Sequence, residues 1–317
     1  MVLDYIIIGA GLSGLTAAKK INELKLGSVV ILEKSRGVGG RMATRRTLGT
    51  RFDHGAQFYR LKKDIENLHE KWLLENVNSF WFDSIDGNHW CAKTGMTALA
   101  KSMTRNLEIN LEKLITNIIY ENGVWRVRSD KDEEWSARHL ILSSPLPQSV
   151  KLLDGVVSQS SFKTKKYEEI KKIEYTKALI ALVSFEEDIF INDSGYAEYK
   201  SGDFFSLADQ KRKGISEIPA LTITMSPQFS EEYFEHNDEV IIEEIIKRFS
   251  NQYPQLKILA SELKKWRYCR PTSQYENLHC EIADNLYLIG DAFGGSSLLG
   301  AVRSAESLCQ LLGERTS

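Results

Sequence analysis

The sequence predicts an α/β fold, in which a doubly wound parallel sheet with an inserted β-meander is joined to a second α+β domain. Residues 5–8 form a short apolar, β-branched run that leads into a glycine-rich turn and then into apolar residues at helical spacing. Residues 107–143 change to strand periodicity around Asn122-Gly123, a dipeptide typical of hairpins. Near the end of the chain, residues 285–289 form another buried strand that again runs into glycine.

The turn after the first strand has the spacing of a dinucleotide-binding motif, Gly-x-Gly-x-x-Gly. Gly9 permits the tight turn, Gly11 lets the backbone approach a pyrophosphate, and Gly14 lets the helix pack closely on the sheet. The helix N-terminus, with Leu12 and Ser13 in its first turn, offers free N–H groups and a partial positive charge to phosphate. An incidental glycine-rich turn is the alternative.

The second strand, residues 29–32, ends in Glu33, 19 residues after Gly14, where a ribose-binding carboxylate is expected. Up to this point NAD and FAD are equally compatible with the sequence. The following residues 34–41 are glycine-rich and end in Arg41, whose planar guanidinium suits phosphate and ribose oxygens. NAD dehydrogenases rarely carry such a loop. It resembles the second motif of the flavin amine oxidase superfamily, which implies FAD; a basic surface loop is the alternative.

The strand at residues 285–291 ends in Gly290-Asp291 and is followed by the glycine-rich residues 294–301 and a helix. This order places a further helix N-terminus behind a core strand. The partial positive charge of such a terminus can stabilise negative charge on a reduced flavin ring. A glycine-rich turn before a C-terminal helix, without any cofactor, is the alternative.

The remaining elements suggest a discontinuous domain organisation. Helices are expected at residues 62–76, 162–174 and 238–250 and after a plausible N-cap at Thr94, and strands at residues 124–128, 139–144, 177–185 and 221–225. The stretch from residue 186 to residue 213 is expected to be rich in loops. We predict an FAD-binding domain of residues 1–60, 92–150 and 266–317, and a substrate domain of residues 61–91 and 151–265.

The composition is that of an ordinary globular protein, since 42% of the 317 residues are apolar and 26% are charged. The net charge of −2 gives no sign of a nucleic-acid or membrane partner. No apolar run is long enough to span a bilayer, and the N-terminus lacks the pattern of a signal peptide. The four cysteines are scattered without metal-ligand spacing, so we expect free thiols, no metal and a cytoplasmic location.

Over essentially its whole length the chain resembles the renalase-like flavoproteins, a branch of the flavin amine oxidase superfamily, and their bacterial members in particular. The segments that carry the resemblance are residues 9–14, 34–42, 53–58, and 265–271 with 289–291. The resemblance implies the amine-oxidase or p-hydroxybenzoate-hydroxylase type of fold with FAD bound non-covalently. The implied FAD contacts are Gly9, Gly11, Leu12, Ser13, Gly14, Glu33, Lys34, Gly40, Arg41, Met42, Ala56, Gln57, Gly290, Asp291, Leu299, Gly300 and Ala301.

The resemblance also implies candidates for the substrate side of the flavin, which are Gln57, Lys177, Trp266 and Tyr268. Two of the positions depart from the family pattern. Leu299 stands where the family often has an acid. Lys177 stands where renalases have an aromatic residue, although amine oxidases use a lysine near the flavin in a comparable strand; an exposed lysine at a strand end is the alternative. Core packing is the alternative for Trp266.

The implied activity is that of an FAD-dependent oxidase, in which a small reduced substrate gives a hydride to flavin N5 and O2 reoxidises the flavin to yield H2O2. No side chain stands out as a general base; His54 is the best candidate, with strand packing as its alternative role. A dihydronicotinamide or a neutral amine already has a lone pair that drives hydride loss. Renalase-like proteins are associated with misreduced dihydronicotinamides, so an NAD(P)H-related substrate ranks first and a primary amine or polyamine second.

A reading from another class is a non-catalytic binding protein with the same fold, as the GDP-dissociation inhibitors are. Such proteins lose the cofactor signatures. Glu33, Arg41 and Asp291 are all present in this chain, which favours the enzyme.

Overall fold

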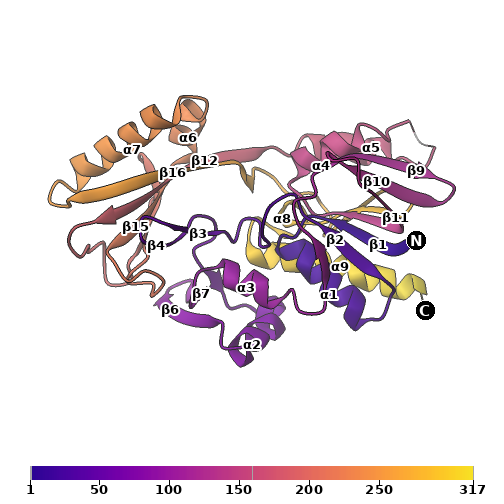
Figure 1. Ribbon diagram of the computed structural model, residues 1–317, viewed down its shortest axis with the longest axis horizontal. Helices are drawn as coiled ribbons and strands as arrows, with labels where there is room; N and C mark the ends of the chain where they lie inside the picture. Colours follow the sequence, from indigo (N-terminus) through magenta and orange to yellow (C-terminus); the bar gives the residue numbers. More distant parts are fainter. Residues whose placement is uncertain (1, 159, 317) are drawn as a thin grey trace. The chain divides into compact units, whose positions relative to one another are not determined.

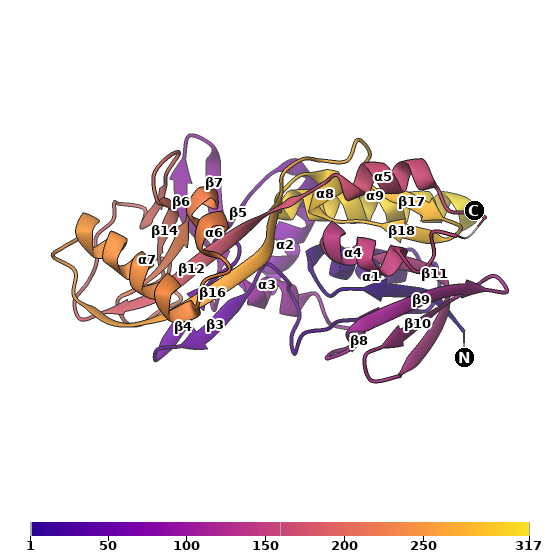
Figure 2. The same cartoon turned by 90° about the horizontal axis from the view of Figure 1, so that it is seen from above.

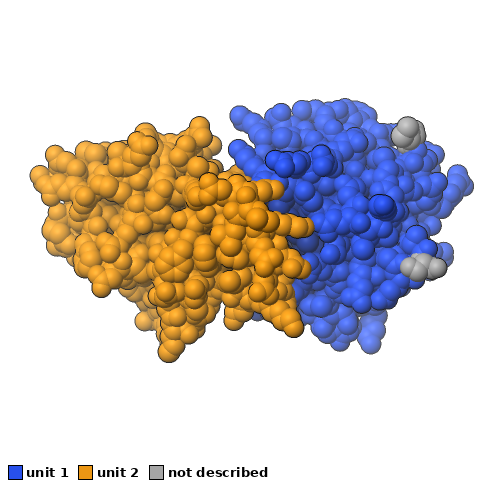
Figure 3. All heavy atoms as spheres, turned by 90° about the horizontal axis from the view of Figure 1, so that it is seen from below, with its two compact units in different colours: residues 1–40, 100–175, 270–317 blue, residues 41–99, 176–269 orange. Residues whose placement is uncertain are grey.

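The computed structural model describes residues 2–158 and 160–316 (Figure 1, Figure 2). The chain forms two compact units (Figure 3). Unit 1 comprises residues 1–40, 100–175 and 270–317, and unit 2 comprises residues 41–99 and 176–269. The predicted FAD-binding and substrate domains are also discontinuous, but they are functional assignments and stay a prediction.

Unit 1 is built on a largely parallel sheet. Its strands are β1 (Leu3–Ile8), β2 (Val29–Leu32), β8 (Glu108–Asn110), β11 (Glu134–Leu142), β17 (Cys280–Ala283) and β18 (Leu286–Leu288), in the order β17-β18-β11-β1-β2-β8. The pairs β1–β2, β1–β11, β11–β18 and β2–β8 are parallel, and β17 pairs with β18 in the antiparallel sense. The predicted meander is present, since β9 (Ile115–Glu121) and β10 (Val124–Ser129) form a hairpin that joins β11.

Side-chain alternation along the central strands gives the sheet of unit 1 two packed faces. On one face Ile6 and Ile8 share a core with Trp125 of the meander and with Ile170. Helices α4 (Leu146–Leu153) and α5 (Thr164–Lys171) cover this core. Helices α1 (Leu12–Glu23) and α9 (Leu298–Thr316) pack together on the other face (Figure 1), and the short α8 (Asp291–Gly294) precedes α9. This layered arrangement confirms the predicted fold class.

Unit 2 contains a second, antiparallel sheet with helices on one face. Its strands are β12 (Tyr175–Phe185), β13 (Tyr196–Glu198), β14 (Phe204–Asp209), β15 (Ala220–Met225) and β16 (Ile258–Pro271), in the order β13-β14-β15-β12-β16. Helices α6 (Pro227–Tyr233) and α7 (Asp238–Gln252) pack on Leu179 and Ala181 of β12. The hairpin of β3 (Thr44–Thr47) and β4 (Thr50–Asp53) packs on the other face, where Phe52 contacts the cluster of Ala178 and Ile180.

A smaller sheet completes unit 2. It consists of β5 (Tyr59–Arg60), β6 (Asn78–Ser84) and β7 (Gly87–Ala92), in the order β5-β7-β6. The 3-10 turn η1 (Lys63–Ile65) and helix α2 (Glu66–Leu74) connect β5 to β6 and account for the helix predicted at residues 62–76. Trp72 of α2 is buried, and its Nε1 donates to the Leu99 carbonyl at 3.2 Å.

Of two predictions about local structure in unit 2, one is wrong and one is only partly right. Thr94 is not a helix N-cap, because α3 (Thr97–Ser102) begins three residues later. Gly95 has a φ of +102°, a conformation that suits a turn, and the Met96 N–H donates to Asp53 Oδ1 at 2.8 Å. The stretch at residues 186–213 is mostly irregular, as expected, but it also contains the strands β13 and β14.

Candidate functional site

The turn between β1 and α1 leaves room above one of its three glycines. Gly9 has a φ of +108°, and a Cβ on Gly14 would lie 2.1 Å from the Gly9 carbonyl oxygen. A Cβ on Gly11, in contrast, would meet no heavy atom of the described residues within 4 Å. The N–H groups of Leu12 and Ser13 belong to the first turn of α1 and have no intrahelical acceptor. An open space beside helical N–H donors fits a pyrophosphate, as the sequence predicts.

Glu33 is the residue that follows β2, and its carboxylate lies beside the glycine turn. Its side chain is buried, and Oε2 accepts the Ala10 N–H at 2.7 Å while Oε1 accepts the Ser35 N–H at 2.8 Å. Each oxygen keeps a lone pair, which is what two ribose hydroxyls require. The Lys34 side chain is engaged elsewhere, since its Nζ donates to Gln148 Oε1 at 3.1 Å.

The second glycine loop folds back over the first. The Gly39 N–H donates to the Ala10 carbonyl at 2.8 Å, and Gly39 forms a parallel bridge with Gly11. Gly40 has a φ of +52°, and a Cβ on it would approach the Gly11 Cα to 3.4 Å. The two glycine segments, residues 9–14 and 39–40, thus pack together into one cradle. Such a cradle is consistent with a dinucleotide lying along it.

The C-terminal glycine segment forms a second helix terminus in unit 1. Gly290 has a φ of +141°. The next residue, Asp291, is buried, and its Oδ1 accepts a hydrogen bond from the Tyr175 hydroxyl at 3.4 Å. The first turn of α9 contains Leu299, Gly300 and Ala301. A Cβ on Gly300 would lie 1.8 Å from the Gly295 carbonyl oxygen, so the α8–α9 turn closes only with glycine there. This helix start can stabilise negative charge.

Two further cofactor candidates lie side by side in unit 2. The Ala56 N–H donates to the Arg41 carbonyl at 2.8 Å, and a Cβ on Gly55 would lie 1.9 Å from the same oxygen. Met42, next to Arg41, is buried. The Arg41 guanidinium donates through Nη1 to the Cys269 carbonyl at 3.0 Å. Residues 41–43 and 53–57, which include the implied FAD contacts Arg41, Met42, Ala56 and Gln57, therefore form one packed surface within this unit.

Trp266 packs on this surface. Its Nε1 donates to the His54 carbonyl at 2.8 Å, and its ring is stacked on the His54 imidazole with centroids 5.5 Å apart. It also packs on the cluster around Phe52. Tyr268 is two residues further along β16 and so lies on the same face of that strand. The structure thus brings Trp266 together with the loop that contains Gln57.

Lys177 lies on the opposite face of the antiparallel sheet. Its Nζ forms ion pairs with Glu231 at 2.8 Å and with Glu235 at 3.6 Å and lies 5.3 Å from the ring centroid of Phe234. The next residue on β12, Ala178, points the other way, into the cluster with Trp266. Lys177 is therefore held by the helix-covered face, and the structure does not bring it together with Gln57 or Trp266.

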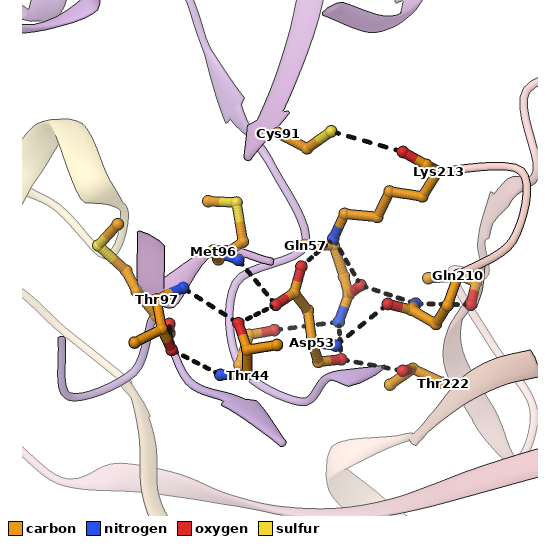
Figure 4. Close-up of polar contacts among 12 residues, drawn as sticks. Thr44, Asp53, Gln57, Cys91, Met96, Thr97, Gln210, Lys213 and Thr222 are labelled. Atoms are coloured by element: carbon orange, nitrogen blue, oxygen red, sulfur yellow. Dashed lines mark hydrogen bonds and ion pairs between the residues drawn. The ribbon is translucent and has the colours of Figure 1, made fainter. Parts of the chain in front are cut away.

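A buried polar network surrounds Gln57, and the sequence reasoning did not identify it (Figure 4). Lys213 Nζ lies 2.6 Å from Asp53 Oδ2, and both side chains are fully buried. Lys213 also donates to Gln57 Oε1 at 3.2 Å, as Gln210 Nε2 does at 3.2 Å. Asp53 belongs to the quoted motif, but Lys213 and Gln210 come from the segment expected to be loop, and no local pattern links them to it.

His54 provides a pH-dependent prediction. Burial, together with the positive charge of Lys264, lowers the pKa of His54 from 6.5 to about 4. Between these values the unfolded chain binds a proton that the folded chain does not, so stability is complete above pH 6.5 and declines toward pH 4. We expect this group to remove about 2–3 kcal/mol of unfolding free energy over that window. Urea unfolding of wild type and His54→Asn at several pH values measures it; equal pH slopes would contradict the prediction.

Two features are absent from residues 2–158 and 160–316. Within these ranges no helix combines the length and the apolar character needed to cross a membrane. Within them, too, no group of three or more His, Cys, Asp or Glu side chains is placed to hold a metal ion.

Family models match most of the chain. Residues 7–72 match the model of an NAD(P)-binding Rossmann-like domain, and residues 74–312 match the model of flavin containing amine oxidoreductases. The first match covers the glycine cradle and Glu33. The second covers the meander, most of unit 2 and the glycine segment before α9.

Individual proteins agree with these models. The chain is 23% identical to renalase of Mus musculus over 97% of its own length and 98% of that protein. Its fold is similar to that of a putative protoporphyrinogen oxidase from Exiguobacterium sp. 255-15, with a TM-score of 0.79, 14% identity and coverage of 98% and 99% of the two chains. Cyclohexylamine oxidase from Brevibacterium oxydans gives a TM-score of 0.77 at 11% identity, with both chains fully covered.

Proposed function

The chain belongs to the flavin-containing amine oxidoreductase family and is an FAD-dependent oxidoreductase, and we propose that it oxidises a small reduced substrate of the dihydronicotinamide type. When bound, FAD would supply a hydride acceptor at flavin N5, and O2 would serve as the final oxidant and yield H2O2. The proposal includes a cytoplasmic location, which the scattered cysteines of the sequence support. It also includes the FAD-binding and substrate domains predicted above.

The cradle of unit 1 supports a specific set of FAD contacts. The N–H groups of Leu12 and Ser13 would bind the pyrophosphate above Gly11, where a side chain would find open space. Glu33 would accept the ribose hydroxyls with the lone pairs that Ala10 and Ser35 leave. Both roles follow from groups that the fold already orients, so binding costs little rearrangement of the chain.

The observation that carries the substrate class is how the ionisable side chains beside Gln57 are engaged by their neighbours. The Asp53 carboxylate is neutralised by Lys213 at 2.6 Å, and the pKa of His54 is lowered to about 4. Asp53 is held by hydrogen bonds to Lys213, Met96 and Thr44, and a histidine with so low a pKa is a weak base near neutral pH. A protonated amine must lose a proton before it can lose a hydride. A dihydronicotinamide carries no such proton, because its ring nitrogen already has a lone pair.

A flavin amine oxidase is the second candidate, and the aromatic residues of β16 favour it. Trp266 and Tyr268 lie on one face of the strand, and aromatic faces attract ammonium groups by a cation–π interaction. Cyclohexylamine oxidase shares the fold. Only the uncharged fraction of such an amine could react without a base, so its rate would rise with pH.

Anaerobic bleaching of the bound flavin tests the choice. The purified holoprotein is mixed in a stopped-flow instrument with α-NADH, with other misreduced dihydronicotinamides, and with a panel of primary amines and polyamines. We expect rapid loss of the oxidised flavin absorbance with dihydronicotinamides, and H2O2 in a peroxidase-coupled assay when oxygen returns. Rapid bleaching by amines alone would reverse the ranking. If the purified protein contains no bound flavin, the proposed oxidase activity is contradicted.

A further inference from the structure

The ion pair between Lys213 and Asp53 lies outside the glycine motifs that hold the cofactor. The two residues are separated by 160 positions in the chain, and Lys213 follows β14 while Asp53 ends β4. Both side chains are fully buried, and Lys213 Nζ also lies 5.0 Å from the ring centroid of Trp81. Burying two charges costs desolvation energy that a hydrophobic pair would not incur. A buried ion pair of this kind therefore indicates a role in holding neighbouring groups in place.

Asp53 connects four separate segments of unit 2 (Figure 4). Its Oδ2 accepts from Lys213, and its Oδ1 accepts the Met96 N–H at 2.8 Å and the Thr44 hydroxyl at 2.5 Å. Its backbone carbonyl accepts the Thr222 hydroxyl at 2.9 Å. The bonds to the Asp53 carboxylate are charge-assisted and so stronger than neutral hydrogen bonds. Asp53 is thus held from several sides in one position.

The Gln57 amide is saturated by the same network. Its Oε1 accepts from Lys213 and Gln210, each at 3.2 Å. Its Nε2 donates to the Asp53 carbonyl at 2.7 Å and to the Gly55 carbonyl at 3.3 Å. A glutamine amide offers two donors and two acceptor sites, so none is left for a substrate. The ammonium of Lys213 can only donate and the carbonyls can only accept, so the orientation of the amide is fixed as well.

We propose that Lys213 is a positioning residue for the flavin. Through Asp53 and Gln57 it fixes residues 53–57 against residues 41–43, and thereby sets the surface that Arg41 and Ala56 present to the cofactor. The hydrogen bond from the Ala56 N–H to the Arg41 carbonyl, at 2.8 Å, joins the two segments. This inference rests on the proposed function, because the resemblance alone places Arg41 and Ala56 at FAD. It also replaces the expected role of Gln57 as a substrate-side group with a supporting one.

The test uses a charge-neutral double variant of the holoprotein, Asp53→Asn with Lys213→Met. Methionine keeps the apolar stem of the lysine, and asparagine keeps an oxygen for Met96 and Thr44. The matched control makes the same two changes in the exposed ion pair Asp188–Lys211, whose side chains are 72% and 41% exposed. FAD affinity of the reconstituted apoprotein, the visible flavin spectrum and the limiting rate of anaerobic flavin reduction are measured for each.

We expect the buried variant to bind FAD about tenfold more weakly, with a shifted flavin spectrum, and to reduce its flavin roughly tenfold more slowly, because small displacements of positioning groups have effects of this order. The control should match wild type in all three measurements. Gln57→Leu should reproduce the effects of the double variant. Combining all three changes should add little, because groups that act as one unit are not additive.

Each outcome decides the proposal. A folded double variant with wild-type FAD affinity and spectrum overturns it, as do fully additive effects with Gln57→Leu. If the double variant does not fold, Gln57→Leu decides alone, since it leaves both members of the ion pair in place and removes only the hydrogen bonds of the Gln57 amide to Lys213, Gln210 and the Asp53 and Gly55 carbonyls. If no donor bleaches the wild-type flavin, the proposed function fails, while FAD affinity and spectrum still test Lys213 separately.

Discussion

A Gly14→Ala chain is expected to purify with little or no FAD and to unfold at lower denaturant than wild type. The new Cβ would lie 2.1 Å from the Gly9 carbonyl oxygen and 2.7 Å from Ser143 Oγ. Neither neighbour can move freely, because Ser143 Oγ donates to that same carbonyl at 2.9 Å. Helix α1 would have to lift from the turn, at a cost of about 1–3 kcal/mol or more for such overpacking. Flavin absorbance after desalting and urea unfolding of the apoprotein measure the two effects.

Gly11→Ala is the matched control, because it separates the fold from the cofactor. Its Cβ would meet no heavy atom of the described residues within 4 Å, and the φ of −73° suits alanine. The apoprotein should therefore keep its stability to within about 0.5 kcal/mol. FAD affinity should still fall, because the methyl group takes the space proposed for the pyrophosphate. Wild-type affinity in Gly11→Ala would place the phosphates elsewhere, and wild-type stability in Gly14→Ala would contradict the close approach of helix and turn.

The cofactor cradle could be predicted because its signals are local. The strand, the three glycines, the helix and Glu33 follow one another within the first 33 residues, and each step has its own pattern. The Asn122-Gly123 hairpin and the glycine segment before α9 are equally local. In such stretches the local spacing of residues is enough to indicate the backbone conformation.

The buried network could not be predicted, because its partners meet only in the folded chain. Lys213 reads as one more charged residue in a polar stretch, and 160 positions separate it from Asp53. The sequence also does not show which face of the sheet a residue lies on when both faces of that sheet are covered. Lys177 is an example, since the alternation of β12 sends it toward α6 and sends Ala178 toward Trp266. Strand β3 is not predicted for a related reason, because its Thr and Arg residues show no apolar alternation, whereas residues 51–60 can be read as a strand or turn.

Glu33→Ala should weaken FAD binding by about 100-fold, the loss expected when one or two hydrogen bonds to a charged group disappear. The carboxylate has two tasks, because it accepts the Ala10 and Ser35 N–H groups and is placed to accept the ribose hydroxyls. Glu33→Gln should fall between wild type and alanine, since it keeps one carbonyl oxygen but sets an NH2 group against a backbone donor. Fluorescence titration of the apoprotein with FAD gives the dissociation constants.

The control for Glu33 is Glu108→Ala, an equal change of charge at an exposed position on β8, which pairs directly with β2. It should leave the dissociation constant of FAD unchanged. Circular dichroism and urea unfolding of each apoprotein distinguish a lost ribose contact from a loosened turn, because the first lowers affinity alone and the second lowers affinity and stability together. A Glu33→Ala apoprotein that binds FAD as tightly as wild type would show that the carboxylate serves the turn and not the ribose.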